Sequence, residues 1–207
     1  MSGWDGIDAV LYINLASRSD RRDHLLEELG RARVPENKLH RIDAIKRDPG
    51  ALGCTLSHIK AFQMILDHGW ERVLILEDDF TWMPGTDIVG NIKELSGVKK
   101  GWDVIQISWN PSGRIIGDGP LSWLRRAVGV RTTSGYFVRG GFVNELIENF
   151  KESAVDIYKN GLSPESCCDM AWQKLQHDAN WYVAYPPLGY QMDGYSDVEG
   201  RDVSYGC

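Results

Sequence analysis

The sequence predicts an α/β protein with a mixed central sheet flanked by helices. Short strand-like runs alternate with amphipathic helical segments over the first half of the 207-residue chain, which is typical of α/β folds. Several of these runs are continuously apolar, as expected for parallel strands buried on both faces. Segments with the pattern of antiparallel strands follow in the second half of the chain. The length fits a single domain over residues 1–207, with an N-terminal half of about 8–108 and a C-terminal half of about 109–207.

The chain begins with a strand, a helix and a second strand. Ala9 to Leu15 form the first apolar run. Ser17 or Ser19 is a suitable cap for the next helix, since a serine oxygen accepts a hydrogen bond from a free N–H at a helix start. The apolar face of this helix consists of Leu25, Leu26 and Leu29. A short second strand is predicted for Leu39 to Ala44.

A long helix precedes the central strand of this half. We predict it from about Leu52 to His68, because its apolar residues are spaced by three and four: Leu52, Leu56, Ile59, Phe62 and Leu66. Gly69 stands where a helix C-cap favours glycine. The next predicted elements are a strand at 72–76, a helix at Thr86–Leu95 and a strand at Asp103–Ser108.

The second half combines a loop, a hairpin and two helices. Residues 109–120 contain three glycines and two prolines, which predicts a loop. Alternation over residues 121–138 indicates a hairpin around Arg131 to Ser134. The remaining predicted elements are helices at Gly140–Lys151 and Glu165–Gln176 and a last strand at Trp181–Tyr185.

Charge narrows the range of partners. The net charge of −6 argues against general binding of nucleic acid. Residues 114–140 nevertheless hold five arginines and one aspartate. Such a basic stretch fits either a phosphorylated ligand or a solvated hairpin, and both readings stay open.

Neither a membrane span nor a disulfide framework is predicted. No apolar stretch approaches the roughly 18 residues of a membrane span, and the first residues lack the pattern of a signal peptide; we therefore expect a cytoplasmic protein. The four cysteines show no zinc-site spacing: Cys54, Cys167, Cys168 and Cys207. Free thiols in a reducing compartment are the expected state.

Three consecutive acids follow a buried strand, and they are the strongest functional signal. Val73 to Leu76 form the continuous apolar run, and Glu77, Asp78 and Asp79 come directly after it. Neighbouring buried carboxylates raise one another's pKa, and Mn²⁺ or Mg²⁺ removes this penalty because such cations bind carboxylate oxygens. Ligands of α/β sheets bind at the carboxyl ends of strands. The pattern therefore predicts a metal site, with a solvated acidic turn as the alternative.

Six segments, in order along the chain, together match the motifs of one known family. The first two are Tyr12-Ile13-Asn14-Leu15 with the arginines after it, and Leu52-Gly53-Cys54-Thr55-Leu56-Ser57-His58. The next two are Leu74–Asp79 and Thr133–Val138, and the last two are Asp169 and Pro187–Val198. These segments resemble glycosyltransferase family 25, which includes lipooligosaccharide and procollagen galactosyltransferases; Asp169 stands where that family carries an acid, and Pro187–Val198 resembles its terminal motif.

The resemblance implies a GT-A-type nucleotide-sugar-binding fold and a metal-dependent, inverting transfer. The donor would be a UDP-sugar, with galactose or a similar hexose. The acceptor would be a hydroxyl of a glycan, a lipid-linked sugar or a protein, as in lipopolysaccharide and other glycan biosynthesis. The N-terminal half would then bind the nucleotide and the C-terminal half the acceptor, with Mn²⁺ or Mg²⁺ as cofactor.

Within the acidic motif, Asp79 is the expected direct metal ligand, because an inverting transfer needs a cation beside the departing diphosphate. Glu77 is the second ligand, through the metal or the ribose hydroxyls. Asp78 is expected to face the sugar or to be held by backbone donors. Alternation along an extended segment would place Glu77 and Asp79 on one face and Asp78 on the other.

Asp169 is the candidate general base, which an inverting transfer needs near the acceptor. An aspartate that only favours a helix terminus is the alternative. Asn14, Arg18 and Arg22 follow the first strand, where nucleotides dock in α/β sheets; a charged helix face is their alternative role.

Further candidates for binding the nucleotide sugar lie on the long helix and in the tail. His58 could approach the donor or form hydrogen bonds within the core. The glycine-containing tail is predicted to close over the diphosphate as a lid through Gln191, Asp193, Ser196 and Asp197.

Two other classes of function share parts of this pattern. A nucleotidyltransferase or phosphoesterase would also place acids at a strand end, but the chain lacks a phosphate-binding Gly-x-x-x-x-Gly-Lys-Ser/Thr loop. A non-catalytic sugar-binding relative would keep the fold without needing all the acids.

Overall fold

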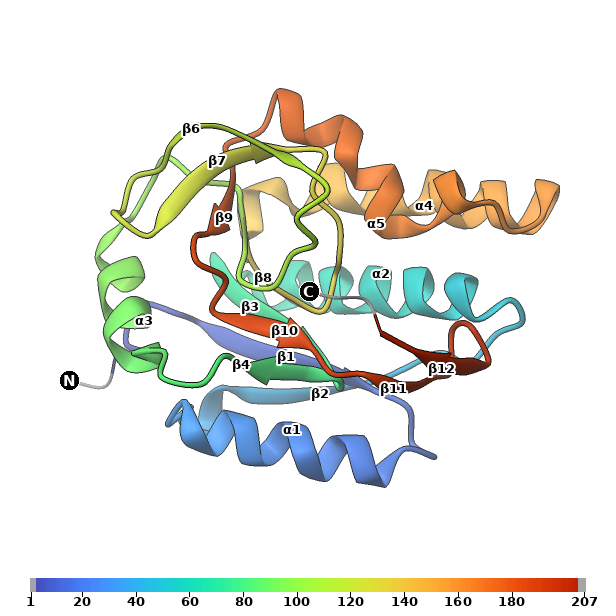
Figure 1. Cartoon of the computed structure of the whole chain (residues 1–207), viewed down its shortest axis with the longest axis horizontal. Helices are drawn as coiled ribbons and strands as arrows, with labels where there is room; N and C mark the ends of the chain where they lie inside the picture. Colours follow the sequence, from blue (N-terminus) through green and yellow to red (C-terminus); the bar gives the residue numbers. More distant parts are fainter. Residues whose placement is uncertain (1–2, 205–207) are drawn as a thin grey trace.

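The computed structural model describes residues 3–204, and within this range an eight-stranded mixed sheet forms the centre of the molecule (Figure 1). In spatial order its strands are β2 (Leu39–Asp43), β1 (Ala9–Asn14), β3 (Arg72–Glu77), β8 (Gly135–Arg139), β5 (Val104–Gln106), β9 (Trp181–Ala184), β7 (Leu124–Val128) and β6 (Arg114–Asp118). The sheet takes strands from both halves of the chain.

Strand direction determines where the loops gather. Strands β1, β2 and β3 are parallel, whereas β8 pairs with β3 in the antiparallel sense. The carboxyl ends of the three parallel strands therefore meet the start of β8 at one edge of the sheet. Ligands of open α/β sheets bind at this kind of edge.

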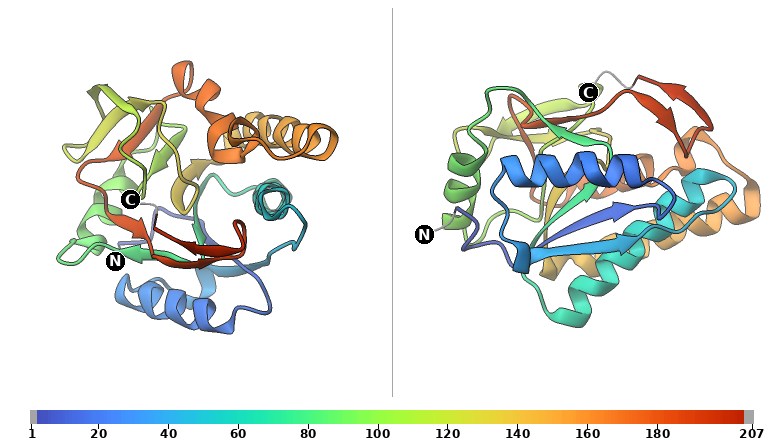
Figure 2. Two further views of the ribbon diagram at one scale, coloured as in Figure 1. Left: turned by 45° about the vertical axis from the view of Figure 1, so that its right-hand side comes forward. Right: turned by 90° about the horizontal axis from the view of Figure 1, so that it is seen from below.

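Helices cover both faces of the sheet, as Figures 1 and 2 show. Side chains of β1 alternate between two hydrophobic clusters, because successive residues of a strand point to opposite faces. Leu11 packs with α2 (Gly50–His68) and α4 (Val143–Asn160). Val10 packs with α1 (Ser19–Arg31) and α3 (Ile88–Gly97). This burial on both faces explains the continuous apolar strands.

Two small ribbons bring the tail to the acidic motif. β4 (Phe80–Trp82) follows the acids directly and pairs with β10 (Gly189–Gln191). β11 (Gly194–Ser196) pairs with β12 (Arg201–Val203). Residues 189–191 of the tail are thus hydrogen-bonded to the segment that follows β3.

The predicted α/β class with a mixed central sheet is confirmed, and so is the long helix. Helix α2 runs from Gly50 to His68, and Gly69 ends it in the left-handed region at φ 65°. The helix predicted from Gly140 is also present, after a short 3₁₀ turn, as α4.

The predicted hairpin over residues 121–138 is wrong. Strand β7 pairs with β6 and β9, whereas β8 lies between β3 and β5. The side-chain amide of Gln106 donates to the carbonyls of Arg131 and Thr132, so this segment is held against β5 instead of turning back on β7. The predicted loop of 109–120 likewise contains β6.

Two helix predictions need correction. The stretch predicted as one helix from Glu165 is divided into a 3₁₀ turn at Pro164–Ser166, α5 (Cys168–Ala171) and a second 3₁₀ turn at Trp172–His177. Cys167 breaks it, because its backbone is extended (φ −61°, ψ 144°). Helix α1 begins after Arg18 without a side-chain cap, so neither Ser17 nor Ser19 caps it.

Other sequence expectations concern the membrane and the cysteines. Among the helices of residues 3–204, none combines the length and the apolar character that crossing a bilayer requires. Cys54, Cys167 and Cys168 are free thiols, and Cys207 lies outside the described residues.

Candidate active site

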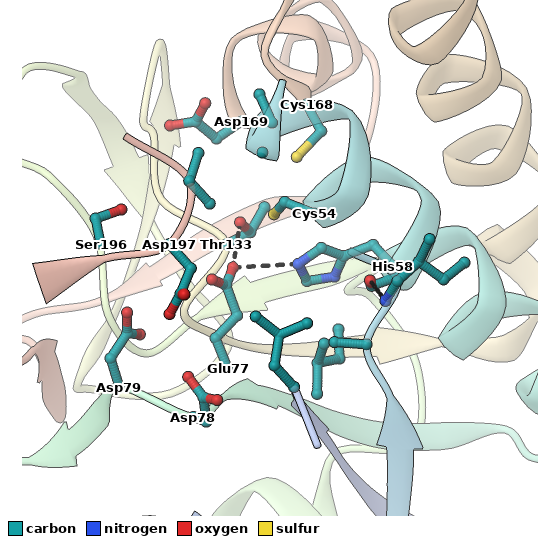
Figure 3. Close-up of a pocket in the computed structure, with 18 of the residues that line it drawn as sticks. Cys54, His58, Glu77, Asp78, Asp79, Thr133, Cys168, Asp169, Ser196 and Asp197 are labelled. Atoms are coloured by element: carbon teal, nitrogen blue, oxygen red, sulfur yellow. Dashed lines mark hydrogen bonds and ion pairs between the residues drawn. The ribbon is translucent and has the colours of Figure 1, made fainter. Parts of the chain in front are cut away.

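A cavity of about 290 Å³ opens at the sheet edge where β1, β2 and β3 end (Figure 3). Its wall comes from α2, from the acidic motif, from the segment before β8, from α5 and from the tail. The lining side chains that the argument uses are Cys54, His58, Glu77, Asp78, Asp79, Thr133, Cys168, Asp169, Gln191 and Asp197. Residues that are distant in the sequence, from the N-terminal half to the tail, therefore meet in one place.

Glu77 is the acid that the surrounding side chains orient most closely. His58 Nε2 lies 3.1 Å from Glu77 Oε1, and Thr133 Oγ1 donates to the same oxygen at 2.5 Å. His58 is fully buried on α2, with Nδ1 2.9 Å from Tyr136 Oη. Burial acts to raise the pKa of Glu77, but hydrogen bonds from His58 and Thr133 outweigh it and lower the pKa. Glu77 is thus held as a carboxylate.

Asp78 and Asp79 share a buried cation that the sequence analysis did not predict. Arg21 Nη1 donates to Asp78 Oδ1 at 3.2 Å and to Asp79 Oδ2 at 3.1 Å. The two aspartates occupy a turn between β3 and β4. The predicted alternation of faces is therefore wrong: Asp78 and Asp79 contact one guanidinium, while Glu77 points toward His58 (Figure 3).

Asp79 keeps one oxygen for which the protein supplies no partner. Gln191 and Arg21 both donate to Oδ2, whereas Oδ1 is buried without any hydrogen-bond partner. Burial, followed by repulsion from Glu77, raises the pKa of Asp79 to about 7. A buried carboxylate oxygen facing a cavity without a partner is costly, and a hard divalent cation is a suitable partner for it. The residues present thus fit a metal.

A side chain at the end of β1, Asn14, holds Asp78 in place by a hydrogen bond. Asn14 Nδ2 donates to Asp78 Oδ2 at 2.7 Å, and Arg41 Nη2 donates to Asn14 Oδ1 at 3.1 Å. Burial raises the pKa of Asp78, against the effect of the hydrogen bonds from Asn14 and Arg21. Asn14 acts here through Asp78, because it is not part of the cavity wall.

Asp169 lies across the cavity on α5, close to two thiols. Its Oδ2 accepts a hydrogen bond of 3.3 Å from the backbone N–H of Thr132, and burial raises its pKa. The neighbouring Cys168 thiol, followed by burial, raises the pKa of Cys54 well above its usual value. The cavity thus contains a carboxyl group whose raised pKa suits proton transfer.

An ion pair and a hydrogen bond to helix α1 hold the tail over part of the cavity. Arg18 Nη1 donates to Asp197 Oδ2 at 2.5 Å, and Arg21 Nη2 donates to the carbonyl of Tyr195 at 2.7 Å. Ser196 and Asp197 line the wall beside Gln191. These contacts connect the tail to helix α1.

The structure brings eight of the twelve predicted site residues to the cavity wall: His58, Glu77, Asp78, Asp79, Asp169, Gln191, Ser196 and Asp197. Asn14 and Arg18 contact wall residues from behind. Arg22 is 41% exposed and pairs with Asp23, and Asp193 is exposed; neither belongs to the wall.

Several wall residues were missed in the sequence. Arg21 and Thr133 lie in two of the segments that carry the family resemblance. Only the structure shows that Arg21 contacts Asp78 and Asp79 and that Thr133 contacts Glu77. Lys46 and Arg47 lie on the wall beside the start of α2, where cations and a helix N-terminus favour an anion. The adjacent pair of basic residues just before the long helix was the sequence signal that could have indicated this anion site.

Arg21→Met is expected to lower the free energy of unfolding by about 3 kcal/mol at neutral pH, because it leaves two buried carboxylates without their cation. Urea denaturation without divalent metal measures this change. Arg22→Met is the matched control on the same helix, and it should stay within about 0.5 kcal/mol because Arg22 is exposed. Equal effects of the two substitutions would show that the buried contacts of Arg21 do not stabilise the fold.

Sequence comparisons connect this site with one enzyme family. The model of glycosyltransferase family 25 (LPS biosynthesis protein) matches residues 48–94, which include α2 and the acidic motif. Procollagen galactosyltransferase 2 of Mus musculus is 26% identical over 129 residues, covering 49% of this chain and 21% of the relative. Procollagen galactosyltransferase 1 of Danio rerio is 29% identical, with the same coverage. The matched region thus spans about a fifth of these relatives.

A third relative is a family member whose name describes it as inactive. The inactive glycosyltransferase 25 family member 3 of Homo sapiens is 28% identical over 131 residues, covering 49% of this chain and 22% of the relative. Sequence likeness of this degree is therefore shared by a protein named inactive.

Solved structures share the fold at low sequence identity. A glycosyltransferase involved in the glycosylation of the major capsid of PBCV-1 aligns with a TM-score of 0.51 and 11% identity, covering 92% of this chain and 95% of that one. A197 from STIV aligns with a TM-score of 0.51 and 10% identity, covering 97% and 95%. The chain is thus similar to glycosyltransferase family 25 over residues 48–94 and to curated relatives of that family over about half its length, and it shares its fold with a solved glycosyltransferase.

Proposed function

We propose that the chain transfers a hexose, galactose or a similar sugar, from a UDP-sugar to an acceptor hydroxyl, with inversion and with a divalent metal. The observation that carries the proposal is Asp79, whose unpartnered buried oxygen lies on the wall of a cavity at the carboxyl edge of the sheet. Such an edge is where α/β proteins bind nucleotides. The wall also carries a second carboxyl group, Asp169, with a raised pKa.

Asp79 is the first proposed ligand of Mn²⁺ or Mg²⁺, and Glu77 is the second. A cation bound there supplies positive charge next to the departing diphosphate. Arg21 neutralises part of the charge of Asp78 and Asp79 and holds both side chains in place. His58 and Thr133 hold Glu77 as a carboxylate.

The remaining wall residues suit the other parts of a nucleotide sugar. Asp78, oriented by Asn14, is proposed to accept hydrogen bonds from ribose hydroxyls. Lys46 and Arg47, beside the start of α2, are proposed to bind the diphosphate, because guanidinium and ammonium groups form charge-assisted hydrogen bonds with phosphate. The N-terminal half would thus bind the nucleotide, and the C-terminal half the acceptor.

Asp169 is proposed to take the proton of the acceptor hydroxyl as its oxygen attacks the anomeric carbon. The backbone N–H of Thr132 donates to one oxygen of Asp169, which leaves the other oxygen for this proton. On the side of the tail, Gln191, Ser196 and Asp197 are proposed to enclose the donor. The name of the procollagen relatives favours a protein hydroxyl as acceptor, and the description of the family favours a lipid-linked glycan.

Hydrolysis of UDP-hexoses with and without Mn²⁺ tests the function directly. Metal-dependent release of UDP is expected, and it should increase when a suitable acceptor is added. Hydrolysis of other nucleotides or phosphoesters in preference to UDP-hexoses would favour another metal-dependent enzyme.

A non-catalytic sugar-binding relative is the second candidate. It is favoured by Arg21, a cation of the protein itself that already contacts two of the three acids, and by the relative named inactive. Binding of a UDP-sugar with no turnover of donor and no effect of Mn²⁺ would support this candidate.

Arg47→Ala is expected to weaken UDP binding by about 1.5–3 kcal/mol, the range of a hydrogen bond to a charged group. Calorimetry in the presence of Mn²⁺ measures the change. Arg22→Ala is the control, because Arg22 lies outside the cavity wall. Unchanged affinity in Arg47→Ala would remove Arg47 from the diphosphate site.

A further inference from the structure

The cavity has two sides with different ligand chemistry, and Glu77 lies between them (Figure 3). We call the side with Asp78, Asp79, Gln191 and Asp197 the oxygen side. We call the side with Cys54, His58 and Cys168 the sulfur side. Oxygen ligands suit Mg²⁺ and Mn²⁺, whereas thiolate and imidazole together favour Zn²⁺. The two sides therefore differ in the cation that they select.

We propose that the sulfur side binds Zn²⁺ through Cys54, His58 and Glu77, and that this occupancy withdraws Glu77 from the nucleotide-sugar site. The metal-binding atoms of these three residues lie within 4.8 Å of one another. Cys54 and His58 are one turn apart on α2, so both point from the same helix face. Glu77 reaches them from the end of β3.

Cys54, His58 and Glu77 supply three ligands, which leaves the fourth position of a tetrahedral zinc site open. The Cys168 thiol lies on the same side of the cavity, outside this cluster of three (Figure 3). Each Zn–S bond forms as a thiol releases its proton to solvent, so no oxidant or reductant is needed.

The neighbours of these ligands also fit a metal site. Zinc-binding histidines usually donate their second ring N–H to a neighbouring acceptor, which fixes the tautomer. Tyr136 Oη lies 2.9 Å from His58 Nδ1 and can accept that proton, which leaves Nε2 for the cation. Thr133 Oγ1 donates to Glu77 Oε1 and so orients the carboxylate.

Titration of the purified protein with Co²⁺ tests the site, because Co²⁺ replaces Zn²⁺ and reports on its ligands by absorption. A sulfur-to-cobalt charge-transfer band that saturates at one equivalent and disappears on addition of Zn²⁺ is expected. Cys54→Ser should lower the apparent Zn²⁺ affinity at least about 10–100-fold, the loss that even an outer partner causes. Cys167→Ser is the matched control, since Cys167 lies on the wall but outside the cluster.

Proton release from the wild-type protein gives a second test that needs no variant. Zn²⁺ binding through a thiol must release its proton, so calorimetric titrations of Zn²⁺ in two buffers of different ionisation enthalpy should show release of at least about one proton for each Zn²⁺ bound at neutral pH. Absence of the band in the wild type, an unchanged band in Cys54→Ser, or Zn²⁺ binding without proton release would each overturn the site.

The effect on the donor rests on the proposed function, whereas Zn²⁺ binding does not. Asp79→Asn, on the oxygen side, should lose Mn²⁺-dependent UDP binding and keep the cobalt band, so the failure of one proposal is distinguishable from failure of the other. In the wild type, one equivalent of Zn²⁺ should weaken Mn²⁺-dependent UDP binding at least about tenfold, the least that disturbing a metal ligand causes. Unchanged UDP affinity in zinc-loaded protein would overturn the competition for Glu77.

Discussion

Asp79→Asn is expected to abolish Mn²⁺-dependent binding of UDP, with a loss of several kcal/mol, or at least about 10²–10³-fold in affinity. The physical reason is the buried Oδ1 of Asp79, which has no partner within the protein and which we assign to the cation. An asparagine oxygen is a weaker ligand without charge. Calorimetric titration of UDP into the variant with and without Mn²⁺ measures the effect.

The amide should leave the fold intact. Asparagine keeps the volume of Asp79 and can still accept a hydrogen bond from Arg21, and it has no charge to bury. We therefore expect the metal-free variant to unfold at a temperature no lower than that of the wild type. Asp23→Asn is the control, because Asp23 is exposed and lies on the outer side of α1 beside Arg22. Mn²⁺-dependent UDP binding of normal strength in Asp79→Asn would remove the metal from this residue.

Asp169→Asn is expected to reduce transfer to an acceptor by about 10²–10⁴-fold, the range that a general base supplies. Donor binding should stay normal, because Asp169 lies across the cavity from the oxygen side (Figure 3). Asparagine can still accept the hydrogen bond from Thr132 N, so α5 should keep its position. Transfer and donor affinity are measured on the same preparation, since only their difference isolates the chemical step.

Asp178→Asn is the matched control for Asp169→Asn, because Asp178 is exposed and follows the same helical region. A large fall in transfer in both variants would indicate a general effect on this region instead of loss of a base. Normal turnover in Asp169→Asn would assign the base to another acid of the tail, and Asp197 would be tested next because it lies on the cavity wall.

Local patterns in the sequence predicted the elements that pack on two sides. The apolar run Val73 to Leu76 predicted β3 because a strand covered on both faces excludes polar residues. The spacing of apolar residues and Gly69 predicted α2 to within two residues of its observed ends. The hairpin of 121–138 could not be predicted correctly, because alternation shows that a segment is extended but not which strand it pairs with. Gln106, distant in sequence, decided that pairing.

The sequence by itself determined the family resemblance and the position of three acids after a buried strand. Tertiary structure alone decided which neighbours these acids have. Arg21 and Arg22 are adjacent in the sequence, yet one is buried between Asp78 and Asp79 and the other is exposed, because successive helical residues point about 100° apart. Cys54 and Cys168 show no metal-site spacing, but they become neighbours because α2 and α5 pack on the same side of the sheet. Contacts between residues so far apart depend on the closure of the whole fold, which no local pattern records.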